Sequence, residues 1–210
     1  MTTDTTAEAP GGSTTPNGGT SDFRAGAEVR GRALGVSLLA FFAIGWTGWG
    51  TGGHLPTAAQ VPIVIVAAVL SSVLAAAAWR LARRVPAGSD ATPEDVQVGR
   101  RFTWIVAVSW AAVIVAAVVL GMTGHAEMVA ATVCAGIGVH FLPLARLFYL
   151  RAYYVTGAAL CLISIVTFVL APATSNAALW TLIPGVGAAI VLYATCAALL
   201  SESRGIASAT

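Results

Sequence analysis

The 210-residue chain contains no lysine, and only 10% of its residues are charged. This scarcity of charge excludes an ordinary soluble domain, in which about a quarter of the residues are charged. It also argues against nucleic-acid binding, because all eleven basic residues are arginines that flank apolar runs, and no polar domain accompanies them. No aspartate or glutamate lies within these runs. The carboxylate that proton- or sodium-coupled transporters commonly use is therefore missing.

Catalytic and metal-binding motifs are missing as well. The sequence has no glycine-rich phosphate loop with a lysine, no HExxH pair and no serine motif with a plausible triad. Its three cysteines (Cys134, Cys161 and Cys196) form no CxxC pair, and they lie in three different apolar runs where a thiol behaves as a small apolar group. We therefore expect no enzymatic activity, no cofactor and no metal.

What the chain does have is long uncharged apolar runs. Hydrophobic residues make up 57% of it, and a helix needs about 20 such residues to cross a hydrocarbon core of roughly 30 Å. Six runs qualify, at residues 34–50, 60–79, 102–122, 128–148, 153–171 and 177–200. The sequence therefore predicts an all-α polytopic membrane protein, a bundle of six transmembrane helices.

The arginines predict the orientation of these helices. Every arginine lies before the first run, after the second, around the turn between the fourth and fifth, or after the sixth. The other three loops contain none. Because cytoplasmic loops carry the excess of arginine, this pattern predicts three hairpins with both termini in the cytoplasm.

The two ends of the chain differ from the apolar runs. Residues 1–32 are rich in Thr, Gly and Pro and are expected to form a disordered cytoplasmic tail, since they offer little apolar surface to bury. Residues 33–201 form the predicted transmembrane domain, and residues 202–210 a short cytoplasmic C-terminal tail. The missing lysine, with heavy use of Ala, Val, Gly and Arg, suggests a GC-rich bacterial genome and hence the bacterial plasma membrane.

Small residues predict where the helices pack, because helices in lipid approach closely only where side chains are small. Such residues recur every four positions in the fourth and sixth runs: Ala131, Cys134 or Ala135, Gly138, and then Gly185 and Ala189. A compact bundle with little room for a wide aqueous pore follows.

The fourth run holds the candidate functional or packing contacts His140, Pro143 and Arg146. Pro143 deprives the carbonyl of Val139 of its helical donor, so a kink is expected there. His140 at this depth should face the bundle interior and find a partner. One interpretation is a packing histidine bonded to a neighbouring helix, with Thr156, Ser164 and Tyr193 as candidate partners. The alternative is a solute or proton contact at a broken helix.

Arg146 and Arg151 bracket the turn between the fourth and fifth runs, interleaved with Tyr149, Tyr153 and Tyr154. Such side chains are typical of the membrane interface, where arginines reach water and anionic headgroups. A pocket for a phosphate or carboxylate is the alternative. The expected partners are the lipid bilayer, anionic lipid headgroups at the cytoplasmic arginines, and a second copy of the chain or another membrane protein.

On the other side, His54, His125 and Glu127 are the only ionisable residues. Metal binding there is a weak alternative, because three loosely spaced ligands on short turns make a poor site.

The segments "GIGVHFLPLARLF" (Gly136–Phe148) and "YYVTG" (Tyr153–Gly157) resemble a signature of small, uncharacterised multi-pass bacterial membrane proteins. The resemblance implies the architecture and brings no activity with it. The leading hypothesis is a non-enzymatic integral membrane protein that acts through helix packing or partner contacts. The alternative is a small-solute permease or channel-like protein organised around His140 and Pro143.

Overall fold

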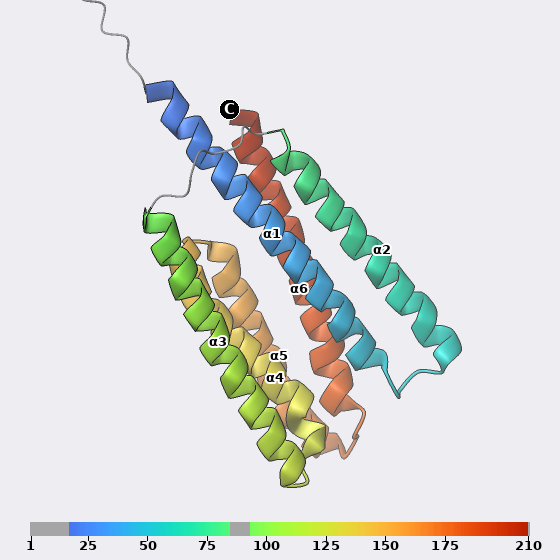
Figure 1. The fold of residues 1–210 in the computed structure, drawn as a ribbon. Helices are drawn as coiled ribbons and strands as arrows, with labels where there is room; N and C mark the ends of the chain where they lie inside the picture. The colour runs from blue at the N-terminus through green and yellow to red at the C-terminus, as the bar shows by residue number, and fades with distance from the viewer. Residues whose placement is uncertain (1–16, 85–92, 210) are drawn as a thin grey trace, which may run out of the picture.

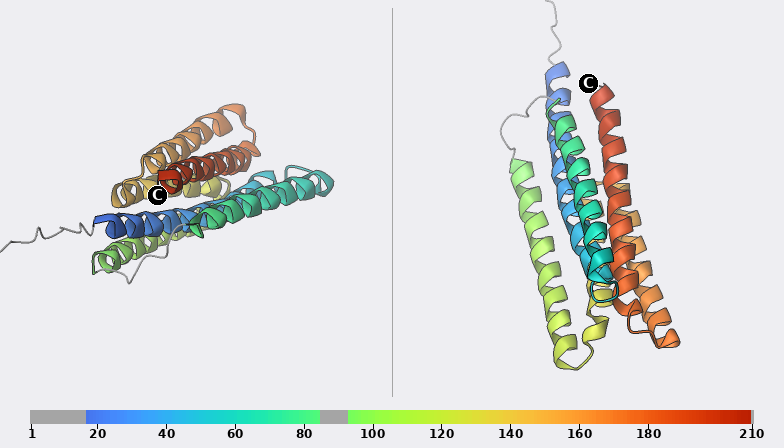
Figure 2. Two further views of the ribbon diagram at one scale, coloured as in Figure 1. Left: turned by 90° about the horizontal axis from the view of Figure 1, so that it is seen from above. Right: turned by 90° about the vertical axis from the view of Figure 1, so that its right-hand side faces the viewer.

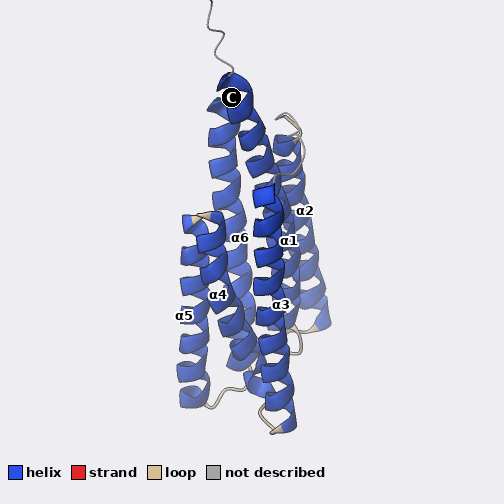
Figure 3. Ribbon diagram, turned by 60° about the vertical axis from the view of Figure 1, so that its left-hand side comes forward, coloured by secondary structure: helices blue, strands red, loops and turns tan. Residues whose placement is uncertain are grey.

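The computed structural model describes residues 17–84 and 93–209, which form a bundle of long α-helices (Figures 1 and 3). They are α1 (Asn17–Thr51), α2 (Thr57–Ala82), α3 (Pro93–Met122), α4 (Val129–Phe148), α5 (Arg151–Thr174) and α6 (Leu179–Ala209), with a short 3-10 helix, η1 (Ala126–Met128), before α4. The predicted all-α class is confirmed for the described residues, which contain no strand.

Within the described residues, six segments are long and apolar enough to cross a membrane, as predicted: Ala27–Thr51, Thr57–Ala82, Gln97–Met122, Ala126–Phe148, Arg151–Thr174 and Leu179–Ile206. Most extend beyond the predicted runs, because the helical hydrogen bonds continue into the polar flanks. The sixth helix instead begins two residues later than the predicted run 177–200. There the side chain of Asn176 accepts a hydrogen bond from the backbone N–H of Ala178 at 3.0 Å and forms a turn before the helix.

The helices do not contact one another equally. α6 contacts α1, α2, α4 and α5, and its contact with α1 is the most extensive in the bundle, followed by that between α4 and α5. These two contacts join helices of different predicted hairpins. α3 lies at the edge (Figure 2). Its backbone approaches only α4 and η1, and none of its described side chains is buried.

Glycine pairs allow two close approaches between helices. Where α1 meets α6, a Cβ built on Gly50 would lie 2.7 Å from the Cα of Gly185. Between α4 and α5, a Cβ on Gly157 would lie 2.7 Å from the carbonyl oxygen of Gly138. Contacts this short do not occur, so only glycine permits these backbones to touch. The predicted packing roles of Gly138 and Gly185 are confirmed.

The cysteines also belong to the packing. Cys134 and Cys196 are fully buried, and Cys161 is partly buried. The thiol of Cys134 faces the carbonyl oxygen of Leu160, and that of Cys196 faces the carbonyl oxygen of Val36, both at 3.5 Å. Each thiol therefore fills a small space between two helices.

One end of the bundle carries all the arginines whose side chains the structure describes. The first half of α1, the end of α2, the start of α3, the α4–α5 turn and the end of α6 gather there (Figures 1 and 3). These segments contain Arg30, Arg32, Arg80, Arg83, Arg84, Arg100, Arg101, Arg146, Arg151 and Arg204. We call this the arginine end.

Both terminal helices extend into the stretches that the sequence analysis treats as tails. α1 begins at Asn17, within the stretch 1–32 expected to be disordered, and α6 continues through most of 202–210. Val29 is 1% exposed and Ser203 4% exposed. The two helices continue side by side past the apolar runs, and the side chains of each are buried against the other helix. Residues 1–16 lie outside the described residues.

The glycine contact between α1 and α6 can be tested with a single methyl group. In Gly185→Ala the new Cβ would overlap the backbone of Gly50, and forced overpacking costs about 1–3 kcal/mol. We expect a lower melting temperature in detergent. Gly45→Ala is the matched control, because a Cβ at Gly45 meets nothing within 4 Å. Equal melting temperatures of the two variants would contradict the contact.

Candidate functional site

His140 lies on α4 and is half-buried. Its Nδ1 is buried and has no hydrogen-bond partner in the described part of the chain. The ring lies edge-on to Phe141, with the ring centres 6.1 Å apart. The expected bond from His140 to a neighbouring helix is not found for this nitrogen within the described residues.

Each expected partner of His140 bonds elsewhere. Ser164 donates to the carbonyl oxygen of Leu160, four residues earlier on its own helix, at 2.9 Å. Serine and threonine hydroxyls commonly satisfy themselves in this way within helices. The hydroxyls of Thr156 and Thr195 lie 2.6 Å apart and join α5 to α6.

Tyr193, the third expected partner, joins α6 to α2. Its hydroxyl donates to the carbonyl oxygen of Ala67 at 2.9 Å and lies 3.0 Å from the hydroxyl of Ser71. Ser71 in turn donates to the carbonyl oxygen of Ala40 on α1 at 2.8 Å. Three helices are thus linked through one tyrosine and one serine. This network is missing from the sequence-based predictions, because its members are far apart in the chain.

Pro143 lies inside α4, which stays helical from Val129 to Phe148. The kink expected at Pro143 stays a prediction. The glycines before it serve packing: a Cβ on Gly136 would meet the side chain of Val113 on α3, and one on Gly138 would meet Cys161 on α5. The segment around His140 thus packs closely against α3 on one side and α5 on the other.

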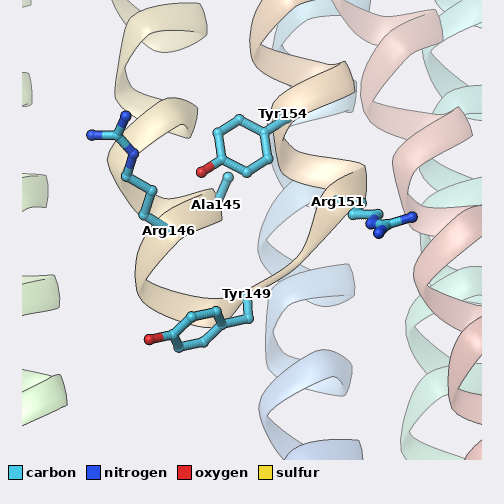
Figure 4. A pocket seen from close by; sticks show the side chains of 5 residues that line it. All are labelled: Ala145, Arg146, Tyr149, Arg151 and Tyr154. Atoms are coloured by element: carbon cyan, nitrogen blue, oxygen red, sulfur yellow. The ribbon is translucent and has the colours of Figure 1, made fainter.

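The α4–α5 turn, next to Arg146, forms an open pocket of about 320 Å³ lined by Ala145, Arg146, Tyr149, Arg151 and Tyr154 (Figure 4). α4 ends at Phe148, and the left-handed backbone of the next residue, Tyr149 (φ 54°, ψ 31°), reverses the chain. The backbone N–H groups of Tyr149 and Leu150 both bond to the carbonyl oxygen of Ala145. This tight reversal brings Arg146 and Tyr154 to the same pocket.

The pocket has two sides. The guanidinium of Arg146 and the hydroxyls of Tyr149 and Tyr154 point to one side, and the guanidinium of Arg151 points to the other (Figure 4). Within the described residues neither arginine forms an ion pair or a side-chain hydrogen bond. Unpaired guanidinium groups beside phenolic hydroxyls can bind an anion, because both supply N–H or O–H donors.

Tyr153 does not belong to the exposed tyrosines with which the sequence groups it. It is 8% exposed, whereas Tyr149 is 92% exposed. Its ring packs edge-on against Phe141 with centres 5.4 Å apart, and its hydroxyl reaches α1, where a Cβ on Gly35 would lie 3.1 Å from it. Tyr153 lies on the buried face of α5, one residue before the exposed Tyr154.

Arg32 is a site that the sequence analysis missed. Its side chain is 11% exposed; Nη1 donates to Glu202 on α6 at 3.0 Å, and Nη2 donates to Glu28 on α1 at 2.6 Å. Its buried Nε has no partner within the described residues. The spacing of Glu28 and Arg32 signals an i, i+4 pair, but nothing in the sequence indicates Glu202.

The ionisable residues at the end opposite the arginine end do not converge. His125 lies 3.6 Å from Glu127 across the turn before η1. His54 instead bonds to the hydroxyl of Thr181. Within the described residues no three His, Cys, Asp or Glu side chains lie close enough to hold a metal ion.

The pairing of Arg32 yields a stability prediction. The Glu28 pair lies within one helix and survives when the helices separate, whereas the Glu202 pair joins α1 to α6. We expect Glu202→Gln to lower the free energy of unfolding by about 1 kcal/mol and Glu28→Gln by about half as much. Unfolding in detergent measures both, with Glu127→Gln as the control. An equal loss for Glu28→Gln would contradict an interhelical role of Glu202.

Comparison with protein-family models, curated proteins and solved structures finds no match. The resemblance of Gly136–Phe148 to a bacterial membrane-protein signature therefore stays an expectation from the sequence.

Proposed function

We propose that the chain is a non-enzymatic integral protein of the bacterial plasma membrane, with six spans, both termini in the cytoplasm, and a function exerted through contacts with lipids and membrane partners. The six apolar helices support the membrane location. The gathering of the described arginines at one end supports the orientation, because arginine accumulates on the cytoplasmic side.

The hydrogen-bonded interior supports the choice of packing over transport. Two depressions on the described surface, one at the α4–α5 turn and one along α2, are open to the outside, and neither includes His140. The second lies along α2 and is lined by Ile65, Ala68, Val69, Ser72, Val73 and Ala76. Interior hydroxyls bond to carbonyls or to one another. Such an interior favours a protein that acts through its outer surface.

One observation favours the second candidate, a small-solute permease or channel-like protein. The buried Nδ1 of His140 has no partner within the described residues, and Pro143 lies one helical turn away. An unpaired polar atom beside a proline is what a solute contact on a hinged helix requires. This candidate needs α4 to move, since the glycine contacts of α4 with α5 leave no space for a solute.

Reporter fusions test the orientation. Fusions after Leu55, Gly124 and Ser175 are expected to report an extracytoplasmic location, and those after Pro86 and Thr210 a cytoplasmic one. The reason is that all arginines lie in the segments assigned to the cytoplasm. A cytoplasmic signal at Gly124 would break the six-span arrangement.

Replacement of His140 separates the two candidate functions. In a packing role, His140→Phe removes a buried nitrogen without a partner and keeps the aromatic contact with Phe141. We expect an equal or higher melting temperature, because an unpaired buried polar group costs about 1–3 kcal/mol. Pro143→Ala should be neutral or mildly stabilising, since it restores the bond to the carbonyl of Val139.

Proteoliposomes provide the second measurement. Osmotic swelling with small neutral and anionic solutes should not differ between liposomes with the wild-type protein and empty liposomes. Swelling that depends on the protein and disappears in His140→Phe would sink the packing role and establish the permease.

A further inference from the structure

We propose that the α4–α5 turn binds the phosphate group of an anionic phospholipid, with Arg146 and Tyr154 as its donors and Tyr149 beside them in the headgroup layer. The proposal deepens the proposed function and rests on the membrane location given there. It goes beyond a general attraction between basic residues and the bilayer, because it assigns one lipid to one pocket.

Two of the donors lie near each other. The guanidinium of Arg146 and the hydroxyl of Tyr154 lie on one side of the turn beside Ala145, whereas the ring of Tyr149 lies apart from them at the end of the turn (Figure 4). The pocket measures about 320 Å³, ample for a phosphate group. A guanidinium binds two phosphate oxygens at once, and a phenol can donate to another.

Within the described residues, no acidic side chain pairs with the arginines of this pocket. Arg146 has no ion-pair partner within the described residues, whereas Arg32 at the same end is paired with Glu28 and Glu202. The first turn of α5 contains no acidic residue, and Leu150 before it provides no side-chain cap. Arg151 adds a second unpaired charge from the other side of the turn. An anion from outside the chain is therefore favoured here.

The exposure of Tyr149 also indicates contact outside the chain. A tyrosine in the left-handed conformation is unfavourable by about 1 kcal/mol, and this position usually holds glycine. Yet the conformation directs a 92% exposed aromatic ring away from the bundle. A phenol in this place suits the headgroup layer, where its ring meets apolar chains and its hydroxyl meets phosphate.

An apolar surface leads away from the pocket and can take the acyl chains. On α4, Leu142 and Val139 precede Arg146 by four and seven residues, share its helix face, and are 39% and 58% exposed. On α5, Leu162 follows Tyr154 by eight residues and is 61% exposed. A free phosphate ion would use the donors alone. A phospholipid uses both the donors and this surface, which is why we assign the lipid.

Titration of the detergent-purified full chain with dioctanoyl-phosphatidylglycerol, followed by native mass spectrometry, tests the assignment. We expect Arg146→Gln to weaken the apparent affinity about fivefold, the effect of one basic residue at an anionic membrane surface. Tyr154→Phe should weaken it about threefold through loss of one hydrogen bond. The matched control is Arg83→Gln, which removes an exposed arginine at the end of α2 outside the pocket. Its affinity should equal that of the wild type.

Three results would overturn the proposal. Equal weakening by Arg146→Gln and Arg83→Gln would show attraction to the arginine end as a whole. Equal affinity for dioctanoyl-phosphatidylcholine would show that the net negative charge is not recognised. Displacement of the lipid by inorganic phosphate at low millimolar concentration would assign the pocket to the free ion.

A different measurement tests the proposed function. Extraction of the chain from membranes by alkaline carbonate would refute the membrane location, whereas the titration in detergent reports on the pocket alone. A chain that resists carbonate but shows no effect of Arg146→Gln and Tyr154→Phe would overturn the lipid site and leave the proposed function standing.

Discussion

The bundle depends on backbone contact between α1 and α6. Apolar side chains gain little by leaving lipid for protein, so helix association in a membrane relies on close packing and interhelical hydrogen bonds. Gly50 and Gly185 supply the closest packing, and the pairing of Arg32 with Glu202 joins the same two helices near the arginine end. α6 then carries the contacts to α2, α4 and α5. Without the glycine pair, an added Cβ would overlap the opposing backbone, and α1 and α6 could not approach this closely.

Hydrogen bonds between helices satisfy hydroxyl groups in the interior. Hydrocarbon offers no donors or acceptors, so each buried hydroxyl needs a partner in the protein. Ser71 and Tyr193 bond to carbonyl oxygens on neighbouring helices, and Thr156 lies against Thr195. His140 stands apart because its Nδ1 has no such partner within the described residues. The pocket with unpaired charge lies instead at the surface, beside Arg146.

The sequence predicts the positions of the helices better than the contacts between them. Six apolar runs are visible one by one, and glycines such as Gly138 and Gly185 mark packing faces, because both signals are local. The sequence could not predict that Thr156 and Tyr193 would form hydrogen bonds with other residues and not with His140, because these other residues come close only in the assembled bundle. The helical parts of residues 1–32 and 202–210 were missed for the same reason, because each of these helical segments is buried against the other. The pocket at Arg146 was foreseen as an alternative, because its residues are adjacent in the chain.

The pairing of α1 with α6 sets the order in which the protein can be assembled. Synthesis proceeds from the N-terminus at about 5–20 residues per second, and α6 begins at Leu179 whereas α1 ends at Thr51. Synthesis of α6, the main partner of α1, therefore begins roughly 6–26 s after α1 is complete. During this interval the face of α1 around Gly50 must be covered by lipid, by α2 or by the insertion machinery. Closure of the bundle therefore waits for the synthesis of α6 and requires the nascent helices to rearrange within the bilayer.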